Sequence, residues 1–386
     1  MINENICRLL EKELVVALGC TEPVAIALAS ATAKKYISEP VTSIYVKASG
    51  NVIKNALSVG IPGMNHTGID FTAALGMIAG DPEKGLQVLE GVTVNEEEIA
   101  VRFVQSGMVS VATADGPEKL FIEVGVKTSS EEAIVVISGD HTNISFISQN
   151  GRVLVDESRP DSSSNSNKTE NTELTIEDLY TFITEVPLHR LNLVKRSVEL
   201  NSAICKEGLS NDYGLRVGKT LYDQTKKGIL SDDLATYSMA LSAAGSDARM
   251  AGSTMPVMAN SGSGNQGIAV TMPVVAAAEK LGVTDEKMLR AVTLSHLLSI
   301  HMKSKFGRLS ALCGVTVAGA SASAAITYLL DDNLDKMKAA IQNTLGNVSG
   351  MVCDGAKAGC AMKVATCSSA AVQSAVLASN GLCIPS

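Results

Sequence analysis

The sequence contains no tryptophan, and only 3% of its 386 residues are aromatic. It also lacks a basic run, and its acidic residues outnumber the basic ones to give a formal net charge of -8. Binding of single-stranded nucleic acid uses aromatic rings on which bases stack, and all nucleic-acid binding uses cations that contact phosphates. We therefore expect no nucleic-acid partner and favour a small-molecule ligand.

Long, strongly apolar runs are also missing. Glu4, Glu11 and Glu13 interrupt the N-terminal segment, which argues against a secretory signal. Residues 309–330 carry no charge, but most of them are small and only weakly hydrophobic, so we predict a buried helix there and not a membrane span. These absences predict a cytoplasmic location and no membrane partner.

The chain lacks the motifs of several large enzyme classes. It has no Gly-Lys-Ser/Thr phosphate loop, no Ser-His-Asp order and no His-Glu-x-x-His pattern. Its eight cysteines are scattered over a long chain, unlike the disulfide framework of a small secreted domain. We therefore expect reduced thiols, among which a metal site is one interpretation.

The cysteines form the most informative pattern that is present. Cys353 and Cys360 bound the segment Cys-Asp-Gly-Ala-Lys-Ala-Gly-Cys, in which Gly355 and Gly359 allow the backbone to turn and bring both sulfurs to one point. Cys313 lies upstream in Leu-Cys-Gly, at the start of a small-residue helix. Soft thiolates bind thiophilic metals and iron–sulfur clusters. The alternatives are small buried hydrophobic residues and a four-thiolate zinc site, although zinc cysteines usually stand two to four residues apart.

A fourth cysteine occupies a different setting. The segment Gly-Cys-Thr-Glu-Pro ends one predicted helix at Gly19 and begins the next with Pro23, so Cys20 is expected at a helix N-terminus with Thr21 or Glu22 as the cap. The free N–H groups and the helix dipole there favour a thiolate, which can act as a base or nucleophile. A buried thiol in a helix–helix corner is an equal alternative.

Periodicity divides the chain into two kinds of region. It predicts helices over 3–18 and 23–37, a strand and a glycine turn after Pro40, and a helix over 67–80. Further short strands are predicted over 99–104, 108–113, 119–127, 132–138 and 142–148. Residues from 176 onward are rich in Ala, Gly and Ser and predict closely packed helices.

These patterns predict an α+β fold. A mostly helical catalytic domain of closely packed small-residue helices is expected over 1–39 and 176–386, with a small mixed-sheet α+β domain inserted at 40–156. The polar, Ser- and Asn-rich segment 157–175 is expected to be a linker, because it has almost no apolar side chains to bury.

Three polar segments are candidates for holding a ligand. Segment 260–267, Asn-Ser-Gly-Ser-Gly-Asn-Gln-Gly, places glycine N–H groups at a helix start, which suits a phosphate or a carboxylate; a flexible loop is the alternative. Lys54 and Asn55 follow a glycine turn that could hold a carboxylate, although a solvated turn is favoured on spacing alone. Residues 296–313 form a basic approach to Cys313. Its cations are His301, Lys303, Lys305 and Arg308.

Five segments together carry a family resemblance. They are Gly19-Cys-Thr-Glu-Pro, the stretch 50–62, Gly262-Ser-Gly-Asn-Gln-Gly, Gly307-Arg-Leu-Ser-Ala-Leu-Cys-Gly, and Cys353-Asp-Gly-Ala-Lys with Cys360. Over nearly its whole length the chain resembles the L-cysteine desulfidase family, whose relatives are the iron–sulfur L-serine dehydratase alpha chains.

The resemblance implies an oxygen-sensitive lyase that carries a 4Fe-4S cluster and needs no pyridoxal phosphate. It implies that Cys313, Cys353 and Cys360 bind the cluster and that Cys20 accepts the α-proton of the substrate. The implied reaction eliminates the β-substituent of a small amino acid and converts L-cysteine to pyruvate, ammonia and sulfide, with the open iron as a Lewis acid. The remaining cysteines match no family motif and are interpreted as structural; they are Cys7, Cys205, Cys367 and Cys383.

Two alternatives keep the same site: an L-serine dehydratase, and a sensor that binds an amino acid without catalysis. In each case the partner is a small amino acid, L-cysteine or L-serine, and a homo-oligomer is compatible with the sequence. The residues expected to contact the substrate are Lys54, Asn55, Ser261, Gly262, Ser263, Gly264, Asn265, Gln266 and Lys303.

Overall fold

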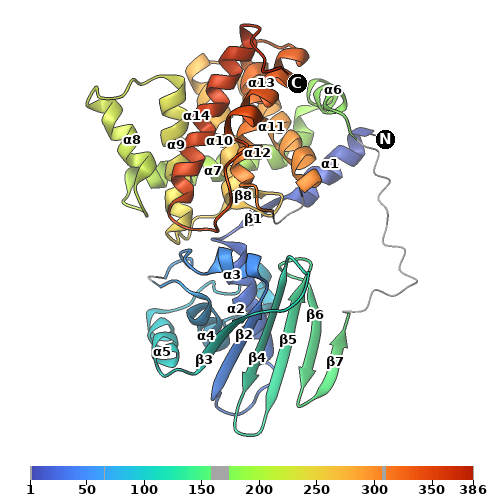
Figure 1. The fold of residues 1–386 in the computed structure, drawn as a ribbon, viewed down its shortest axis with the longest axis vertical. Helices are drawn as coiled ribbons and strands as arrows, with labels where there is room; N and C mark the ends of the chain where they lie inside the picture. The colour runs from blue at the N-terminus through green and yellow to red at the C-terminus, as the bar shows by residue number, and fades with distance from the viewer. Residues whose placement is uncertain (1, 65, 158–173, 307–309, 386) are drawn as a thin grey trace.

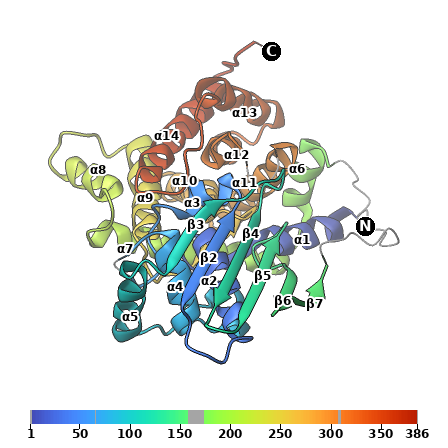
Figure 2. The ribbon, with the colours of Figure 1, turned by 60° about the horizontal axis from the view of Figure 1, so that its bottom comes forward.

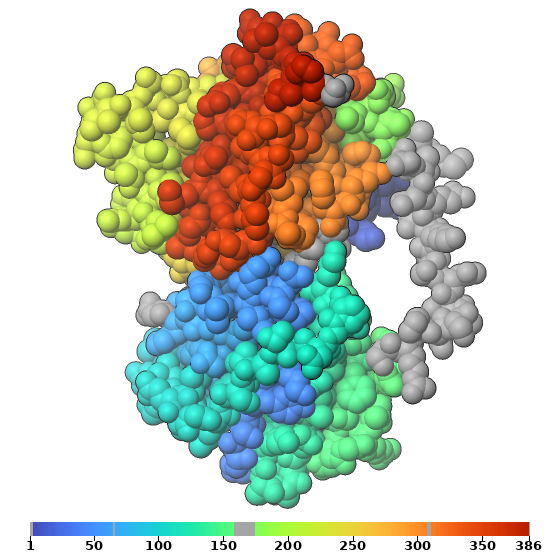
Figure 3. Space-filling view, viewed as in Figure 1, coloured from blue at the N-terminus to red at the C-terminus, as the bar shows by residue number. Residues whose placement is uncertain are grey.

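The computed structural model describes residues 2–64, 66–157, 174–306 and 310–385. These residues form a mostly helical body and a smaller body built on a mixed sheet (Figure 1). The space-filling view shows the two bodies stacked end to end (Figure 3). The predicted α+β class is confirmed. Residues 158–173, which make up most of the predicted linker, lie outside the described residues.

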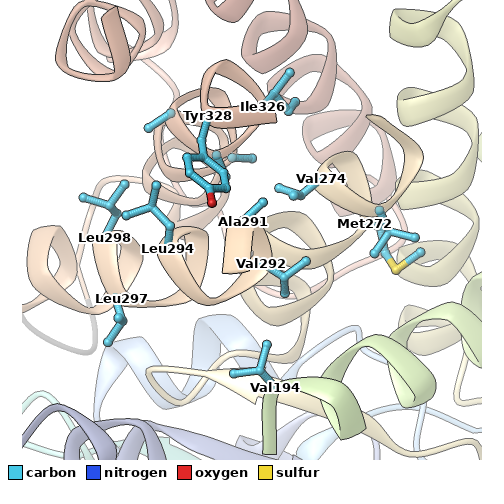
Figure 4. Close-up of a cluster of buried hydrophobic side chains, with 14 of the residues drawn as sticks. Val194, Met272, Val274, Ala291, Val292, Leu294, Leu297, Leu298, Ile326 and Tyr328 are labelled. Atoms are coloured by element: carbon cyan, nitrogen blue, oxygen red, sulfur yellow. The ribbon is translucent and has the colours of Figure 1, made fainter. Parts of the chain in front are cut away.

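The helical body packs its helices around a core of small and aliphatic side chains. Figure 4 shows part of this core, where side chains of one helix, among them Leu294, face Ile326 and Tyr328 of the next. Small residues let backbones approach closely: a Cβ added at Gly319 would lie 3.0 Å from the carbonyl oxygen of Cys367. The elements are α1 (Ile2–Glu13), β1 (Leu14–Ala17), α6 (Ile176–Glu185), η2 (Leu188–Leu191), α7 (Asn192–Ser210), α8 (Val217–Lys226), α9 (Leu234–Met250), β8 (Val257–Asn260), α10 (Gly264–Leu281), α11 (Asp285–Phe306), α12 (Gly314–Leu330), α13 (Leu334–Val348) and α14 (Cys360–Ser379).

The α+β body is a six-stranded sheet in the order β3-β2-β4-β5-β6-β7. Only β2 and β3 run parallel, and the other neighbouring pairs are antiparallel. Two helices, α2 (Thr21–Lys34) and α4 (Ile69–Ala79), pack against the sheet (Figure 2). The other elements are β2 (Ser43–Ala48), α3 (Gly50–Ala56), η1 (Pro82–Gln87), α5 (Val94–Gln105), β3 (Val109–Thr113), β4 (Phe121–Lys127), β5 (Glu132–Ser138), β6 (Ile144–Gln149) and β7 (Arg152–Asp156).

Three local predictions were wrong. The helix predicted over 3–18 ends at Glu13, because the next four residues form β1 and pair antiparallel with β8. The strand predicted over 99–104 lies inside α5, whose start is fixed by a capping box between Thr93 and Glu96. The turn predicted at Lys54 and Asn55 is the last turn of α3.

The position of α2 also differs from the predicted domain range 1–39. Its residues Val24, Ile26 and Leu28 belong to the same buried cluster as Val124 and Val135 of the sheet. This helix therefore carries the residues at its N-terminus into the α+β body. A helix of small buried residues has the same sequence pattern in either body, so periodicity could not assign it.

The two bodies contact each other partly through backbone atoms. The N–H of Gly60 donates to the carbonyl of Met250, and the N–H of Gly63 donates to the carbonyl of Gly252, both at 2.9 Å. A Cβ at Gly60 would lie 2.5 Å from backbone atoms of Ala251, so this approach requires glycine. The contact holds the end of α9 against the segment that follows α3.

Two apolar helices bear on the membrane question. The segment predicted as a buried helix, 309–330, contains α12, which is buried along nearly its whole length. Within the described residues, α14 is long and apolar enough to cross a bilayer, but more than half of it is buried inside the structure. Both helices pack as core helices.

Candidate functional site

A pocket of about 120 Å³ lies where the two bodies meet. Its size is below the roughly 300–1,000 Å³ of sites for drug-sized ligands, so it suits a small molecule. In Figure 1 this is the region where α3 of the lower body faces β1 and β8 of the upper one. The pocket brings together the four cysteines that the sequence singled out, which are Cys20, Cys313, Cys353 and Cys360.

Two of these cysteines lie on adjacent chain segments. Leu312 and Val352 form an isolated antiparallel bridge. The N–H of Cys313 donates to the carbonyl of Met351 at 3.0 Å, and the N–H of Cys353 donates to the carbonyl of Ala311 at 2.7 Å. Cys313 is also the residue that precedes α12. The bridge therefore fixes the backbones of both cysteines beside each other, although they are far apart in the sequence.

Cys360 reaches the pocket from the start of α14. Its thiol donates to the carbonyl of Gly355 at 3.4 Å, which closes the short loop after Cys353. Gly355 has a φ of +100°, and a Cβ there would lie 2.1 Å from the carbonyl oxygen of Lys54 in α3. The glycine turn expected between the two cysteines is present, and its close packing on the α+β body explains why glycine is needed.

The electrostatics around the three thiols are unusual in two respects. Burial raises the pKa of Cys313 to about 11, and burial likewise raises the pKa of Cys360. The walls also carry cations from both bodies, which are Lys54, Arg249, Lys303 and Lys363. Buried thiols need nearby positive charge to ionise. The pocket therefore suits a bound group that cysteine thiolates hold, because the cations in its walls offset the negative charge of those thiolates.

The donor set fits an iron–sulfur cluster in its chemistry, because the pocket offers three cysteines and such clusters are held by cysteine thiolates. Within the described ranges, no three His, Cys, Asp or Glu side chains converge in a way that could hold one ion. In a 4Fe-4S cluster each thiolate binds a different iron, so the ligands surround a group and not a point. Three pocket thiols would leave one iron without a protein ligand.

Cys20 lies in the same pocket but belongs to a separate hydrogen-bond network. It lies at a helix N-terminus, as predicted, but Cys20 itself is the N-cap residue, since Thr21 and Glu22, the expected caps, are the first residues of α2, and the Cys20 side chain makes no capping hydrogen bond. The Cys20 thiol donates to Glu22 Oε2 at 3.0 Å, and Asn55 Nδ2 donates to Glu22 Oε1 at 2.7 Å. His141 Nε2, from the loop between β5 and β6, lies 3.8 Å from Glu22 Oε1. All the charged groups of this network are buried.

The protonation of this network differs from the expected thiolate. Burial and the neighbouring Glu22 carboxylate raise the pKa of Cys20 well above its ordinary value. Burial alone would also raise the pKa of Glu22, but His141, Cys20 and Asn55 together lower it to about 2. The resting pair is thus a thiol and a carboxylate, because desolvation outweighs the helix dipole.

The loop before α10 contributes part of what was predicted. Gly262, Ser263, Asn265 and Gln266 line the pocket. Ser263 also caps α10 by accepting a hydrogen bond from the N–H of Gln266. The other two candidates, Ser261 and Gly264, do not line it: the Ser261 hydroxyl donates to Asn260 Oδ1.

The predicted basic residues have defined contacts. Lys54 Nζ donates to the carbonyl of Cys353 at 3.4 Å, which links α3 to the cysteine loop. Lys303 Nζ lies 3.4 Å from the hydroxyl of Ser310, and burial lowers the pKa of this lysine. Both line the pocket, whereas His301 does not. Arg308 lies outside the described residues.

Sequence reasoning missed three polar residues of the site: Arg249, Lys363 and His141. Arg249 and Lys363 line the pocket, and His141 contacts Glu22. The sequence could have identified Arg249, because this residue lies in a run of Ala, Gly, Ser and Met residues that predicts a buried helix, where an arginine is unusual. The sequence contains no comparable signal for His141, since the position of this residue depends on a strand pairing far from Cys20 in the sequence.

Comparisons with known proteins identify the family of this chain. Residues 83–385 match the family model described as serine dehydratase alpha chain. A UPF0597 protein of Oleidesulfovibrio alaskensis is 46% identical over 374 residues, which cover 97% of this chain and 87% of the relative. A UPF0597 protein of Aeromonas salmonicida is 43% identical over 378 residues, covering 98% and 86% of the two chains. The chain therefore belongs to the serine dehydratase alpha chain family, whose members are dehydratase-like lyases that generally depend on an iron–sulfur cluster.

Proposed function

We propose that this protein is a 4Fe-4S-dependent lyase that converts L-cysteine to pyruvate, ammonia and sulfide without pyridoxal phosphate. The observation that carries the proposal is the meeting of Cys20 with Cys313, Cys353 and Cys360 in one small pocket. The first comes from the α+β body and the other three from the helical body. In this proposal Cys20 is the proton acceptor, and the other three cysteines hold the cluster.

Cys313, Cys353 and Cys360 would hold the cluster. When bound, it supplies a Lewis-acidic iron for the sulfur or oxygen that leaves the β-carbon. The lysines and the arginine of the pocket walls offset the negative charge of three thiolates. Cys313 is buried and the other two cysteines are partly buried, which limits the access of water to the three thiols.

The acid–base chemistry belongs to Cys20 and Glu22. Glu22 accepts the hydrogen bond of the Cys20 thiol at 3.0 Å and positions it, and Cys20, once its proton has been lost to solvent, removes the α-proton of the substrate as a thiolate. The electrons of the Cα–H bond form the Cα=Cβ bond, and the Cβ–S bond breaks with its electron pair on sulfur. The aminoacrylate tautomerises to an imine, and water hydrolyses it to pyruvate and ammonia. His141 and Asn55 keep Glu22 ionised and in place as the hydrogen-bond acceptor of the Cys20 thiol.

L-Serine is the second candidate substrate, because the matching family model is described by a serine dehydratase. Cys20 would again remove the α-proton, and hydroxide or water would leave in place of sulfide. We favour cysteine because thiophilic iron matches sulfur better than oxygen and because sulfide is the better leaving group. A lyase for a free amino acid also accords with a cytoplasmic location.

The deciding experiment is anaerobic turnover. Protein purified without oxygen is incubated with L-cysteine or L-serine, and pyruvate and sulfide are measured. We expect pyruvate and sulfide in equal amounts from L-cysteine and slower pyruvate release from L-serine. A clear preference for L-serine would establish the dehydratase, and binding of either amino acid without pyruvate release would establish the sensor.

A further inference from the structure

Arg249 places a full positive charge in the wall of the pocket. It is the last residue but one of α9 and is only 4% exposed. A guanidinium stays protonated at all physiological pH values, so its burial is costly unless partners compensate the charge. The partners of Arg249 therefore indicate what the pocket is built to bind.

The protein supplies only part of those partners. Arg249 Nη2 donates to the carbonyl of Gly19 at 2.8 Å, whereas Nε has no hydrogen-bond partner. In the described part of the chain, no carboxylate lies within ion-pairing distance of this guanidinium. Arg290 provides a contrast, because its guanidinium contacts the Glu286 carboxylate and the carbonyl of Val186. Arg249 thus has capacity for an anion that comes from outside the chain.

The guanidinium lies against the first turn of α10. A Cβ added at Gly264 would lie 2.2 Å from Arg249 Nε, so the two groups are in direct contact. The first N–H groups of a helix have no partners within the helix, and the helix dipole favours an anion there. Arg249 lines the same pocket as Cys20 and Cys360, so its guanidinium shares the site with the proposed proton acceptor and a proposed cluster ligand.

Two oxygen acceptors without partners lie on the same turn. Asn265 Oδ1 and Gln266 Oε1 are buried, line the pocket and have no hydrogen-bond partner. The orientation of Gln266 is fixed, since its Nε2 donates to Asn260 Oδ1 at 2.9 Å and to Ser299 Oγ at 3.0 Å. Its oxygen is therefore held toward Gly314, where a Cβ would come within 2.7 Å. Such acceptors match the N–H groups of an ammonium ion.

We propose that Arg249 binds the α-carboxylate of the substrate while the side-chain oxygens of Asn265 and Gln266 accept hydrogen bonds from its ammonium group. The pocket then recognises the zwitterion of a small α-amino acid and not a simple thiol or alcohol. This assignment replaces Lys54 and Asn55 as the expected carboxylate contacts, because their polar groups already bind Cys353 and Glu22. It rests on the proposed function only in taking this pocket as the substrate site.

The test compares two ligands that differ only in the carboxyl group, L-cysteine and L-cysteinamide. Binding of each is measured anaerobically by calorimetry in a Cys20→Ala background, where the proposed turnover is blocked. Because both ligands carry the same thiol and amine, their affinity ratio isolates the carboxylate. We expect L-cysteine to bind about 10- to 100-fold more tightly, the range for hydrogen bonds to a charged group. Adding Arg249→Met should abolish the preference, and Arg249→Lys should retain part of it.

The matched control is Arg290→Met, which removes a partly buried arginine outside the pocket and should leave the ratio unchanged. An unchanged ratio in Arg249→Met overturns the proposal. Equal weakening of both ligands would also overturn it, because Arg249 would then act only by holding Gly19. So would a parent protein that binds neither ligand. Pyruvate release is measured separately with Cys20 intact, so failure of the lyase assignment gives a different result from failure of the Arg249 assignment.

Discussion

Two buried polar clusters near the start of α10 differ in how completely they are hydrogen-bonded. Around His296, the hydroxyl of Ser197 lies 2.9 Å from Nε2, and Asn260 Nδ2 donates to Nδ1 at 3.0 Å. Burial lowers the pKa of His296 to about 3, so the ring is neutral and both of its nitrogens are paired. In the pocket, by contrast, atoms of Arg249 and Asn265 have no partner.

The difference separates structural polar groups from ligand-binding ones. A fully paired buried cluster stabilises one packing arrangement, whereas unpaired groups in a cavity are costly unless something binds them. Lack of a partner is not enough by itself: Asp247 Oδ1 is also unpaired, and burial raises its pKa to about 6, but Asp247 does not line the pocket. Only the combination of unpaired atoms and a concave site indicates a ligand.

The largest effect is expected when a proposed cluster ligand in the pocket is replaced. Cys353→Ser or Cys360→Ser should abolish the brown colour and most of the iron of anaerobically purified protein, because each removes a cluster ligand. Visible absorption and iron analysis measure the loss. Cys367→Ser is the matched control, since Cys367 is fully buried and does not line the pocket. A colourless parent protein with bound zinc would contradict the assignment.

A smaller effect is expected at Cys20, which tests whether the pocket contains two functional parts. Cys20→Ala should leave the cluster spectrum intact and lower turnover by about 10²–10⁴-fold, the usual contribution of a general base. Exchange of the substrate α-proton with solvent, followed by NMR in deuterated water, should be lost in parallel. Bleaching of the spectrum would show that Cys20 is a ligand. Retained exchange would place the base elsewhere, with Lys303 the next residue to test.

The smallest effects are expected from replacing one asparagine in each of the two polar clusters, which tests whether the clusters differ in their contribution to stability. Asn201 is fully buried, and its amide contacts the carbonyls of Met258 and Gly267, whereas Asn265 Oδ1 is unpaired. Asn201→Ala should lower the free energy of unfolding by about 2 kcal/mol or more, because it removes the acceptor of the buried Met258 N–H, which donates to Asn201 Oδ1 at 2.9 Å. Asn265→Ala should change it by less than about 1 kcal/mol.

The same two variants should behave in the opposite way toward ligand. Asn265→Ala should weaken binding of L-cysteine, and Asn201→Ala should not. Urea unfolding measures the free energy of unfolding, and calorimetry measures the affinity for L-cysteine on the same preparations. If both substitutions lowered stability equally and weakened binding equally, the division into a structural cluster and a ligand-binding cluster would be wrong.

The sequence predicted those parts of the fold and site that depend on local chemistry. Cys20 at a helix start follows from Gly19 and Pro23, and the turn between Cys353 and Cys360 follows from Gly355. The helix predicted through residue 18 was wrong, because Leu14 continues the apolar stripe of α1 while its actual partner, Asn260, is distant in the sequence. Local periodicity cannot report such a pairing.

The full set of pocket residues could not be predicted from the sequence, because it depends on long-range packing. Its outline could be predicted from the three downstream cysteines, but the Arg249 guanidinium joins Cys20 in the pocket only after the two bodies pack together. The His141 ring reaches Glu22 only through the strand pairing of the α+β body. Neither residue belongs to a motif with characteristic spacing. Asn55 shows the reverse case, because its polar character was recognised while its partner, Glu22, was not.

The contact of Gly60 and Gly63 with the end of α9 has a consequence for how this protein tolerates sequence change. Its hydrogen bonds join main-chain atoms of both bodies, so they are indifferent to the side chains of most residues nearby. Genetic drift can therefore replace those side chains without separating the proton acceptor from the cluster ligands. Gly60 and Gly252 are the exceptions, because a single added methyl group at either position would collide with main-chain atoms of the facing segment.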